Sequence, residues 1–359
     1  MTDVAERLAT RTEELLRIPS ESRCEGHVLA WIRDHVPPGF AVVEDEDAVL
    51  LAMPEPRTDA PLIVLAGHVD TVPAAGSEPV RREDDVLRGR GAADMKGGVA
   101  VMLEVAAGSG GGRDLDLGLV FFGREELPFG ESALLPLLQR RSELRGAALA
   151  ILLEPTANRL ELGCLGNLNA TLTAEGEAAH TARPWLGRNA IHTALRALAP
   201  VVAARVLDVE VDGLTFRESS SVTGIEGGIA GNVVPDRAVA RLNVRYAPTR
   251  TPEEAERSLR ALIASADVGI EVLANAPPGP VPVGNPLVDR LRAAGDLTVG
   301  PKQAWTPVAE FGLIGVDAVN FGPGDPQYAH RDDERVEIAA LVRSYDVLRA
   351  FLDGRGTEG

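Results

Sequence analysis

Imidazole and carboxylate side chains recur in this sequence just after short apolar stretches. The residues concerned are His68 and Asp70 after the apolar stretch 62–66, Asp94 in a glycine-rich turn, Glu125 and Glu126 after 117–122, Glu154 after 148–153, and His330 near the C-terminus. Apolar stretches of this length are typical of strands buried on both faces, as in a parallel sheet. The carboxyl ends of such strands meet at one edge, where open α/β sheets bind their ligands. We therefore expect these side chains to share one rim of one sheet.

Two histidines and several carboxylates, without a thiolate, suit borderline divalent cations, zinc most naturally. One carboxylate shared by two ions, with a histidine and a glutamate on either side, would make a hydrolytic centre with ions ~3.5–4 Å apart. Such a centre lowers the pKa of water toward ~7 and polarises a carbonyl. A carboxylate that binds no metal is then the natural general base. The spacing alone does not decide which glutamate that is, and each residue alone has an ordinary structural explanation, such as a helix cap for Asp94.

Composition excludes several functional classes. The 359 residues include 53 Asp and Glu against 36 Lys and Arg, a net charge of −17, which disfavours binding to nucleic acid or anionic membranes. Cys24 and Cys164 are the only cysteines, so neither a disulfide framework nor a thiolate zinc finger is expected. The first 20 residues are amphipathic and contain acids, unlike a signal peptide, and no apolar run approaches the ~18 residues of a membrane span. We expect a cytoplasmic protein.

The order of predicted elements indicates a mainly parallel α/β sheet carrying an inserted domain. Helical spacing in residues 4–18 ends at Pro19, and the buried strands are then separated by a small-residue helix at 97–107. A β-α-β-β-α-β order follows, typical of a ferredoxin-like unit. Its elements are 168–177, 189–206, 219–227, 237–246, 252–266 and 269–273. A strand at 316–320 and a helix around 335–352 resume the first pattern. The expected domains are catalytic residues 1–166 and 281–359, interrupted by 167–280.

The motifs resemble those of the M20 family of di-zinc metallopeptidases and deacylases, along essentially the whole chain. H-x-D at 68–70, the glycine-flanked Asp94, the Glu125–Glu126 pair, LLEPT and the late Ala-His occur in family order. The segments AAHTARPWLGRNAIH, GGIAGNVVPD and NFGPGDPQYAHRDDERV are most similar to the family's actinobacterial succinyl-diaminopimelate desuccinylases. The resemblance implies a zinc-hydrolase catalytic domain with an inserted lid and dimerisation domain.

The resemblance also assigns roles to individual residues. It implies two Zn²⁺ (or Co²⁺) ions per subunit, with Asp94 bridging, His68 and Glu154 completing one ion, and Glu126 and His330 the other. Glu125 would be the general base, and Asp70 would fix the tautomer of His68. In the lid, His180 resembles a histidine that a homodimer offers to the partner subunit's active site, where it stabilises the oxyanion. The positions of Asn232, Arg245, Gly322 and Gly324 match substrate-contacting ones.

One segment departs from the desuccinylase pattern. WTPVAEF, residues 305–311, has Pro307 and Glu310 where those enzymes usually carry Asp and Arg. If Glu310 faces substrate, the reversed charge would repel a diacid's terminal carboxylate and favour an amine. Alternatively, Glu310 points to solvent or pairs with an arginine.

The expected function is therefore a metal-dependent amide hydrolase that removes an acyl group, succinyl being the first candidate, from the amine of an amino acid. The alternative is an M20 enzyme of different substrate in a specialised pathway. It would be an acetylornithine-type deacetylase, or a peptidase that releases an amino acid from a dipeptide or a carrier. A non-catalytic binding module is disfavoured, because the base and every metal ligand of the family are present.

Overall fold

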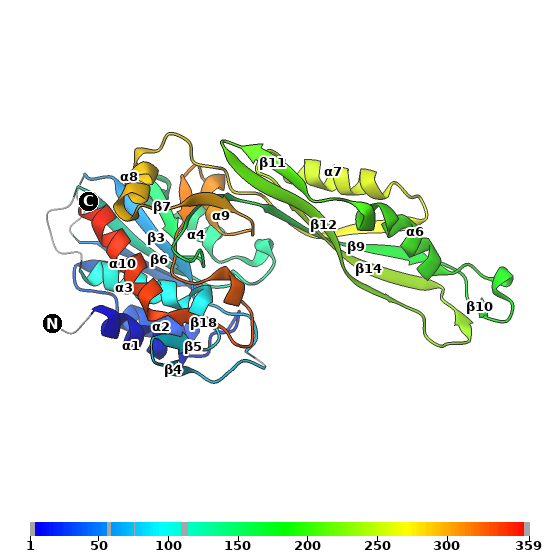
Figure 1. Cartoon of the computed structure of the whole chain (residues 1–359), viewed down its shortest axis with the longest axis horizontal. Helices are drawn as coiled ribbons and strands as arrows, with labels where there is room; N and C mark the ends of the chain where they lie inside the picture. The colour runs from blue at the N-terminus through cyan, green and yellow to red at the C-terminus, as the bar shows by residue number, and fades with distance from the viewer. Residues whose placement is uncertain (1–3, 56–58, 75, 109–113, 355–359) are drawn as a thin grey trace. The chain divides into compact units, whose positions relative to one another are not determined.

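The chain folds into two compact units, which the computed structural model describes over residues 4–55, 59–74, 76–108 and 114–354 (Figure 1). Unit 1 comprises residues 1–163, 280–302 and 306–359, and unit 2 comprises residues 164–279 with 303–305. Unit 2 is thus inserted between two parts of unit 1.

Unit 1 is built on an eight-stranded sheet in the order β1-β2-β6-β3-β7-β17-β8-β16. The strands are β1 (Phe40–Glu46), β2 (Val49–Pro54), β3 (Leu62–His68), β6 (Asp116–Phe122), β7 (Leu149–Leu152), β8 (Leu160–Cys164), β16 (Val299–Lys302) and β17 (Ala318–Asn320). The four central strands β6, β3, β7 and β17 run parallel, whereas β2 and β8 pair antiparallel to their neighbours. The strands β3, β6 and β7 are buried at every residue, which confirms the mainly parallel α/β fold.

Helices and short strands complete unit 1. They are α1 (Val4–Leu16), α2 (Gly26–Asp34), β4 (Arg81–Glu83), β5 (Val86–Arg88), α3 (Gly97–Ala107), α4 (Leu134–Arg140), α5 (Ser142–Arg145), α8 (Pro286–Gly295), α9 (Val308–Leu313), β18 (Arg335–Glu337) and α10 (Ile338–Leu352). The helix α3 is buried along nearly its whole length because it lies between the sheet and the helices α1 and α10 (Figure 1). The helix α9 packs on β17 and β7 and contacts α4.

Unit 2 is an antiparallel sheet with two helices on one face. Its strand order is β11-β12-β14-β9-β15, and α6 (Ala190–Ala203) and α7 (Pro252–Ile263) pack on it. The strands are β9 (Gly166–Glu175), β11 (Leu207–Val211), β12 (Leu214–Gly227), β14 (Arg237–Tyr246) and β15 (Val268–Ala276), with a separate pair β10 (Ala179–His180) and β13 (Val233–Val234). Buried and exposed residues alternate along β9, as expected for a sheet covered on one face.

The hairpin of β11 and the first half of β12 adds to the predicted β-α-β-β-α-β order. Val211 and Leu214 are paired across Asp212 and Gly213, which both have positive φ angles, of 49° and 80°. Such a two-residue turn is the usual connection of a tight hairpin. The sheet therefore has five strands rather than the four that the element order indicates.

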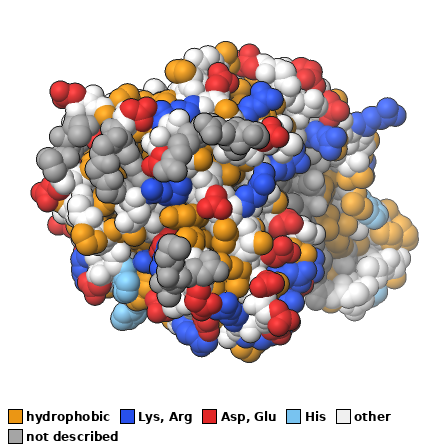
Figure 2. All heavy atoms as spheres, turned by 60° about the vertical axis from the view of Figure 1, so that its left-hand side comes forward, with side chains coloured by type: hydrophobic (Ala, Val, Ile, Leu, Met, Phe, Trp, Pro, Cys, Tyr) orange, Lys and Arg blue, Asp and Glu red, His pale blue; other side chains and the backbone are white. Residues whose placement is uncertain are grey.

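The surface carries both signs of charge. Acidic and basic side chains are interspersed over the visible face in Figure 2. Ion pairs such as Arg82 with Glu6 and Arg33 with Asp45 join side chains that are far apart in the sequence. None of the helices in the described part of the chain is both long and apolar enough to cross a bilayer.

Candidate metal centre

Parallel pairing brings the predicted ligand residues to one edge of the unit 1 sheet. His68 is the last residue of β3 and is in register with Phe122, the last residue of β6. Glu125 and Glu126 follow β6 by a few residues, and Glu154 follows β7 by two. The sequence argument that buried strands deliver these side chains to a common rim therefore holds in the structure.

Asp94 lies at the centre of this cluster. Its Oδ1 is 3.0 Å from Nε2 of His68, and its Oδ2 is 3.4 Å from Nε2 of His330. The same nitrogen of His330 is 2.9 Å from Oε1 of Glu126. Ligand atoms of His68, Asp94 and Glu126 all lie within 4.8 Å of one another. Each oxygen of Asp94 thus faces a different histidine, as a carboxylate shared by two cations requires.

The sequence context of Asp94 allows a helix cap as its ordinary explanation, but Asp94 does not cap a helix in the structure. It lies in the turn η1 (Ala92–Lys96) ahead of α3, with extended backbone angles (φ −126°, ψ 91°). Its side chain is therefore directed by an irregular turn rather than by helical geometry.

Glu154 and Glu125 are carboxylates in a crowded acidic site. The side chain of Glu154 is 4 % exposed, and its Oε1 has no hydrogen-bond partner within the described residues. Burial, together with the charge of Asp94, raises the pKa of Glu154 to about 7, although His68 opposes the shift. Burial likewise raises the pKa of Glu125 well above its usual value. A buried carboxylate oxygen without a partner is unfavourable by itself, and a bound metal ion would satisfy it.

The two histidines favour their charged form, whereas the two glutamates favour their neutral form. Burial alone would lower the pKa of His68, but its hydrogen bonds to Asp70 and Asp94 outweigh burial and raise it. Hydrogen bonds to Asp94 and Glu126 raise the pKa of His330 to about 10. The carboxylates that would stabilise a proton on either imidazole would also attract a cation.

Asp70 holds the loop that carries the glutamate pair. Nδ1 of His68 lies 3.0 Å from the carbonyl oxygen of Asp70 and 3.5 Å from its Oδ1, so the main chain makes the closer contact. The carboxylate accepts the amide N–H groups of Glu125 (3.1 Å) and Glu126 (3.2 Å). It also accepts the hydroxyl of Ser22 at 2.7 Å. Asp70 therefore links the orientation of His68 to the position of the glutamates.

Sequence reasoning missed two residues at this loop. Ser22 fixes Asp70, and Glu25, which is 4 % exposed, accepts the amide of Arg124 at 3.1 Å. Consecutive amides of residues 124–126 are thus each held by a buried carboxylate. Because Ser22 and Glu25 precede the loop by about a hundred residues, no local spacing points to them.

Glu310 lies inside unit 1 rather than in solvent. Its side chain is fully buried on α9, and among the described residues neither carboxylate oxygen has a hydrogen-bond partner of regular geometry. Burial raises the pKa of Glu310 to about 7, while the nearby Ser132 hydroxyl and Leu135 amide lower it in part. The alternative that Glu310 is solvated or paired with an arginine is therefore not what the structure shows.

Gly322 and Gly324 allow the loop before His330 to pack tightly. A Cβ at Gly322 would lie 2.3 Å from the carbonyl oxygen of Leu153, and one at Gly324 would lie 2.1 Å from that of Ala93. The backbone around the ligand candidates Glu154 and Asp94 already fills this space. The glycines thus hold the C-terminal ligand segment against the other two.

Three of the predicted site residues belong to unit 2. The pairing of β10 with β13 brings His180 close to Asn232, whose carbonyl oxygen accepts the amide of Thr181. Nδ1 of His180 accepts the amide of Ala182 at 3.0 Å, which leaves the proton of a neutral ring on the exposed Nε2. Arg245 lies on β14, half buried, with Nε donating to Asn243.

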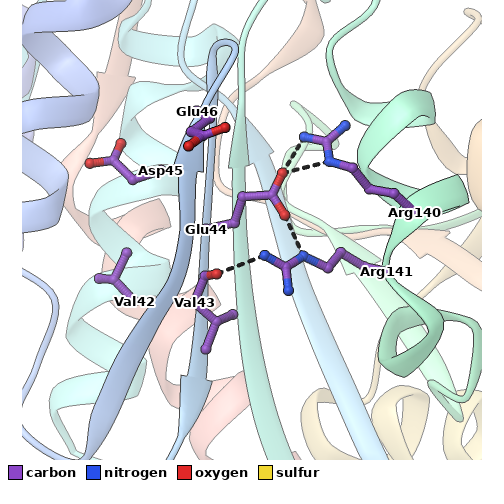
Figure 3. A pocket seen from close by; sticks show the side chains of 7 residues that line it. All are labelled: Val42, Val43, Glu44, Asp45, Glu46, Arg140 and Arg141. Carbon is purple, nitrogen blue, oxygen red and sulfur yellow. Dashed lines mark hydrogen bonds and ion pairs between the residues drawn. The ribbon is translucent and has the colours of Figure 1, made fainter.

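Unit 1 also has a surface hollow of about 610 Å³ between β1 and α4 (Figure 3). Arg140 and Arg141 both reach the carboxylate of Glu44, and Arg141 also donates to the carbonyl of Val43. Glu44 therefore offsets the charge of the two guanidinium groups that line this hollow.

The donor set fits a pair of divalent cations. Five side chains, two imidazoles and three carboxylates, gather at one edge of the sheet, where His68 and Glu154 are buried and His330 is exposed. Glu154 contributes an oxygen that nothing else in the described residues satisfies. Imidazole and carboxylate ligands without thiolate suit zinc and its neighbours in the first transition row.

Comparisons with known proteins agree with this chemistry. The model of the peptidase family M20/M25/M40 matches residues 64–354. A Mycobacterium tuberculosis H37Rv protein, provisionally named succinyl-diaminopimelate desuccinylase DapE, is 40% identical over 96% of this chain and 97% of its own. The succinyl-diaminopimelate desuccinylase of Corynebacterium glutamicum is 37% identical over 95% of each chain.

Solved structures share the fold at lower identity. A Staphylococcus aureus tripeptidase has a TM-score of 0.77 at 20% identity, covering 97% of this chain and 98% of its own. The Bacillus subtilis YXEP protein, described as a dinuclear metal-binding peptidase of family M20, has a TM-score of 0.67 at 14% identity, covering 97% of each chain. The chain is therefore a metal-dependent hydrolase and belongs to the peptidase family M20/M25/M40.

Proposed function

We propose that the protein is a two-zinc amide hydrolase that removes a succinyl group from the amine of an amino acid, as the names of its relatives say of them. The observation that carries the metal assignment is the position of Asp94, whose two oxygens face two different histidines. We assign His68 and Glu154 to one cation and Glu126 and His330 to the other. Cys24 and Cys164 form no disulfide in the described part of the chain, which suits the reducing cytoplasm.

Glu125 is the residue we assign as general base. When bound, the two cations acidify a water molecule and polarise the amide carbonyl. Glu125 takes the proton of the attacking water and later passes it to the departing amine. Its burial supports this role, because burial raises the pKa of Glu125 and a carboxylate with a raised pKa is a stronger proton acceptor.

We further propose that the enzyme acts as a homodimer through unit 2. Large apolar side chains on α6 are exposed, with Leu195 at 54 % and Val202 at 75 %. In the described residues, β12 pairs with β11 only as far as Glu218, so one edge of residues 219–227 has no neighbour. These features support a second copy at this face. His180 would then donate its Nε2 proton to the oxyanion in the partner subunit's site.

The acyl group is assigned through Arg245 and Asn232. A guanidinium can bind the free carboxylate of a succinyl group with two parallel hydrogen bonds. Burial lowers the pKa of Arg245, so its charge is incompletely solvated in the free protein. Gly322 and Gly324 do not add to this assignment, because their carbonyl oxygens accept the amides of Asn158 and Ala157 within unit 1. Glu310 motivates the alternative, an enzyme that prefers an acetylated amino acid or a dipeptide.

The substrate assignment is tested by comparing turnover of succinyl-diaminopimelate, N-acetylornithine and a series of dipeptides by the zinc-loaded enzyme. We expect the succinylated substrate to give the highest kcat/KM, and Arg245→Met to reduce that value much more than the value for N-acetylornithine. A higher kcat/KM for a dipeptide or for N-acetylornithine would replace the desuccinylase assignment. Glu310→Arg then tests selection directly, because an unchanged order of substrates would exclude Glu310 as the selector.

A further inference from the structure

The backbone of Asp94 is hydrogen-bonded by the carboxylate of Glu334, which lies 240 residues further along the chain. Oε1 of Glu334 accepts the amide N–H of Ala93 at 3.1 Å and that of Asp94 at 3.0 Å. The side chain of Glu334 is 1 % exposed. The two hydrogen bonds that this buried carboxylate oxygen accepts fix the main chain at Asp94, on which the metal assignment depends.

Arg90 balances the charge of Glu334. Its Nη1 is 3.1 Å from Oε2 of Glu334 and also donates to the carbonyl oxygen of Arg331 at 3.0 Å. The amide of Gly89 donates to the carbonyl oxygen of Glu334 at 3.0 Å. A buried carboxylate without a cationic partner would be strongly unfavourable, so the ion pair keeps Glu334 in place. Residues 89–94 and 331–334 are thereby joined through several hydrogen bonds.

The segment that carries Glu334 also carries a metal-ligand candidate. His330 lies four residues before Glu334 and faces Oδ2 of Asp94 at 3.4 Å. It has a φ angle of +64°, a conformation that non-glycine residues adopt rarely and that surrounding contacts must maintain. The contacts of Glu334 therefore fix Asp94 and His330 relative to each other.

We propose that Glu334, held by Arg90, is a positioning residue for the metal pair: it keeps the backbone of Asp94 and the imidazole of His330 in the one arrangement in which a single carboxylate serves two cations. This inference rests on the two-metal centre proposed above. It adds a residue pair that touches neither metal nor substrate but sets the distance between the two cation positions. Outer partners that orient ligands in this way typically change metal affinity or activity 10–100-fold when removed.

The test is a calorimetric titration of the metal-free full-length protein with Zn²⁺, together with the visible absorption of the Co²⁺ form. The variants are Glu334→Gln, which keeps the shape and removes the charge, and Arg90→Met, which removes the partner. The matched control is Arg88→Met. Arg88 lies two residues before Arg90 in the sequence and pairs with the exposed Glu83. Glu337→Gln is the second control, because Glu337 is an exposed glutamate at the end of β18, three residues after Glu334.

We expect the wild type and both controls to bind two equivalents of Zn²⁺ with equal affinity. Glu334→Gln and Arg90→Met should bind at least one equivalent 10–100-fold more weakly, with an altered Co²⁺ spectrum and a kcat that falls more than KM changes. The double variant should lose no more affinity than Glu334→Gln alone, since Arg90 acts through Glu334. If Glu334→Gln fails to fold, Arg90→Met carries the same expectation.

Two results separate the failure of this inference from that of the proposed function. Wild-type affinity and an unchanged Co²⁺ spectrum in the folded variants would overturn the positioning role while leaving the metal centre intact. Absence of metal binding by the wild type would overturn the two-metal centre itself, and the positioning role with it.

Discussion

Oδ1 of Asp70 accepts the backbone N–H of Glu125 at 3.1 Å, so the residue beside one metal-ligand candidate fixes the position of the proposed base. Asp70 also lies beside His68, and its second oxygen accepts the N–H of Glu126. The two glutamates are therefore placed by a contact between the ends of β3 and β6, before any cation or substrate binds.

Replacing Asp70 by Asn should misplace the base loop. One carboxylate oxygen becomes an N–H₂ group that cannot accept from an amide, so an N–H of Glu125 or Glu126 loses its acceptor. We expect kcat to fall roughly 10–100-fold. Ser22→Ala, which removes only the hydroxyl that supports Asp70, should give a smaller loss in the same direction. Steady-state kinetics with circular dichroism as the fold control measure both, and unchanged kcat in Asp70→Asn would contradict the role.

Glu125→Gln should abolish proton transfer without emptying the metal site. The amide cannot take a proton from water, and a general base contributes roughly 10²–10⁴-fold to the rate. Metal content measured by elemental analysis should stay at the wild-type value. Glu126→Gln is the comparison, since loss of a proposed ligand should reduce metal content as well as rate. Full activity of Glu125→Gln would assign the base elsewhere.

Removing metal should destabilise unit 1. The metal-free site packs several carboxylates in one buried place, and cations that bind only the folded state add stability by mass action. At a zinc concentration 1,000-fold above the dissociation constant, the gain is about 4 kcal/mol. Thermal unfolding should therefore shift upward by several degrees when zinc is returned to chelated protein. A melting curve that does not respond to zinc would argue against the site.

Glu310 should make stability depend on pH. Its pKa rises from 4.5 to about 7 on folding, so between these values the unfolded chain releases a proton that the folded protein retains. The free energy of unfolding should therefore fall as pH rises from 4.5 to 7, by roughly 3 kcal/mol at most, and then level off. In Glu310→Gln this fall should be reduced. Urea denaturation across this range measures it, with the exposed Glu337→Gln as the control.

Lys302 should support the strand end that carries Glu154. Its Nζ donates to the carbonyl of Pro155 at 2.7 Å and lies 3.1 Å from Oε2 of Glu161. Lys302→Met would leave Glu161, which is largely buried, without its cation, at a cost of roughly 3 kcal/mol. The double variant with Glu161→Gln should recover part of that loss. Chemical denaturation measures the free energy of unfolding of the two variants. Equal stability of Lys302→Met and the wild type would contradict a supporting role of Lys302.

The sequence predicted the centre of the fold better than its edges. The buried strands β3, β6 and β7 and the helix α3 could be predicted because continuous apolar residues leave few alternatives. The edge strand β1 has only half-buried and exposed residues, so no apolar run marks it. The strand β8 is short, and the polar Glu161 interrupts its apolar residues. The hairpin at Asp212–Gly213 has the residues of a tight turn, but its strand β11 follows the helix α6 directly, so the helical pattern extends over it.

The site shows the same division. His68, Asp94 and Glu154 follow apolar strands or sit in a glycine-rich turn, and so they could be found locally. Glu25 and Glu334 could not, because each acts through hydrogen bonds to backbone amides about a hundred residues or more away. A hydrogen bond from a backbone N–H group to a distant carboxylate produces no pattern in the sequence. The contact is therefore seen only in the folded structure.

The insertion of unit 2 has an architectural consequence. Where the chain enters and leaves it, Cys164 and Gly279 exchange backbone hydrogen bonds of 3.1 and 3.2 Å. Entry and exit are thus adjacent, so a different module could be spliced between these two points without stretching the flanking scaffold. Trp305, whose indole N–H donates to the carbonyl of Pro277, would have to travel with the module. Evolution could accordingly exchange the recognition half of such an enzyme while its hydrolytic half stays as it is.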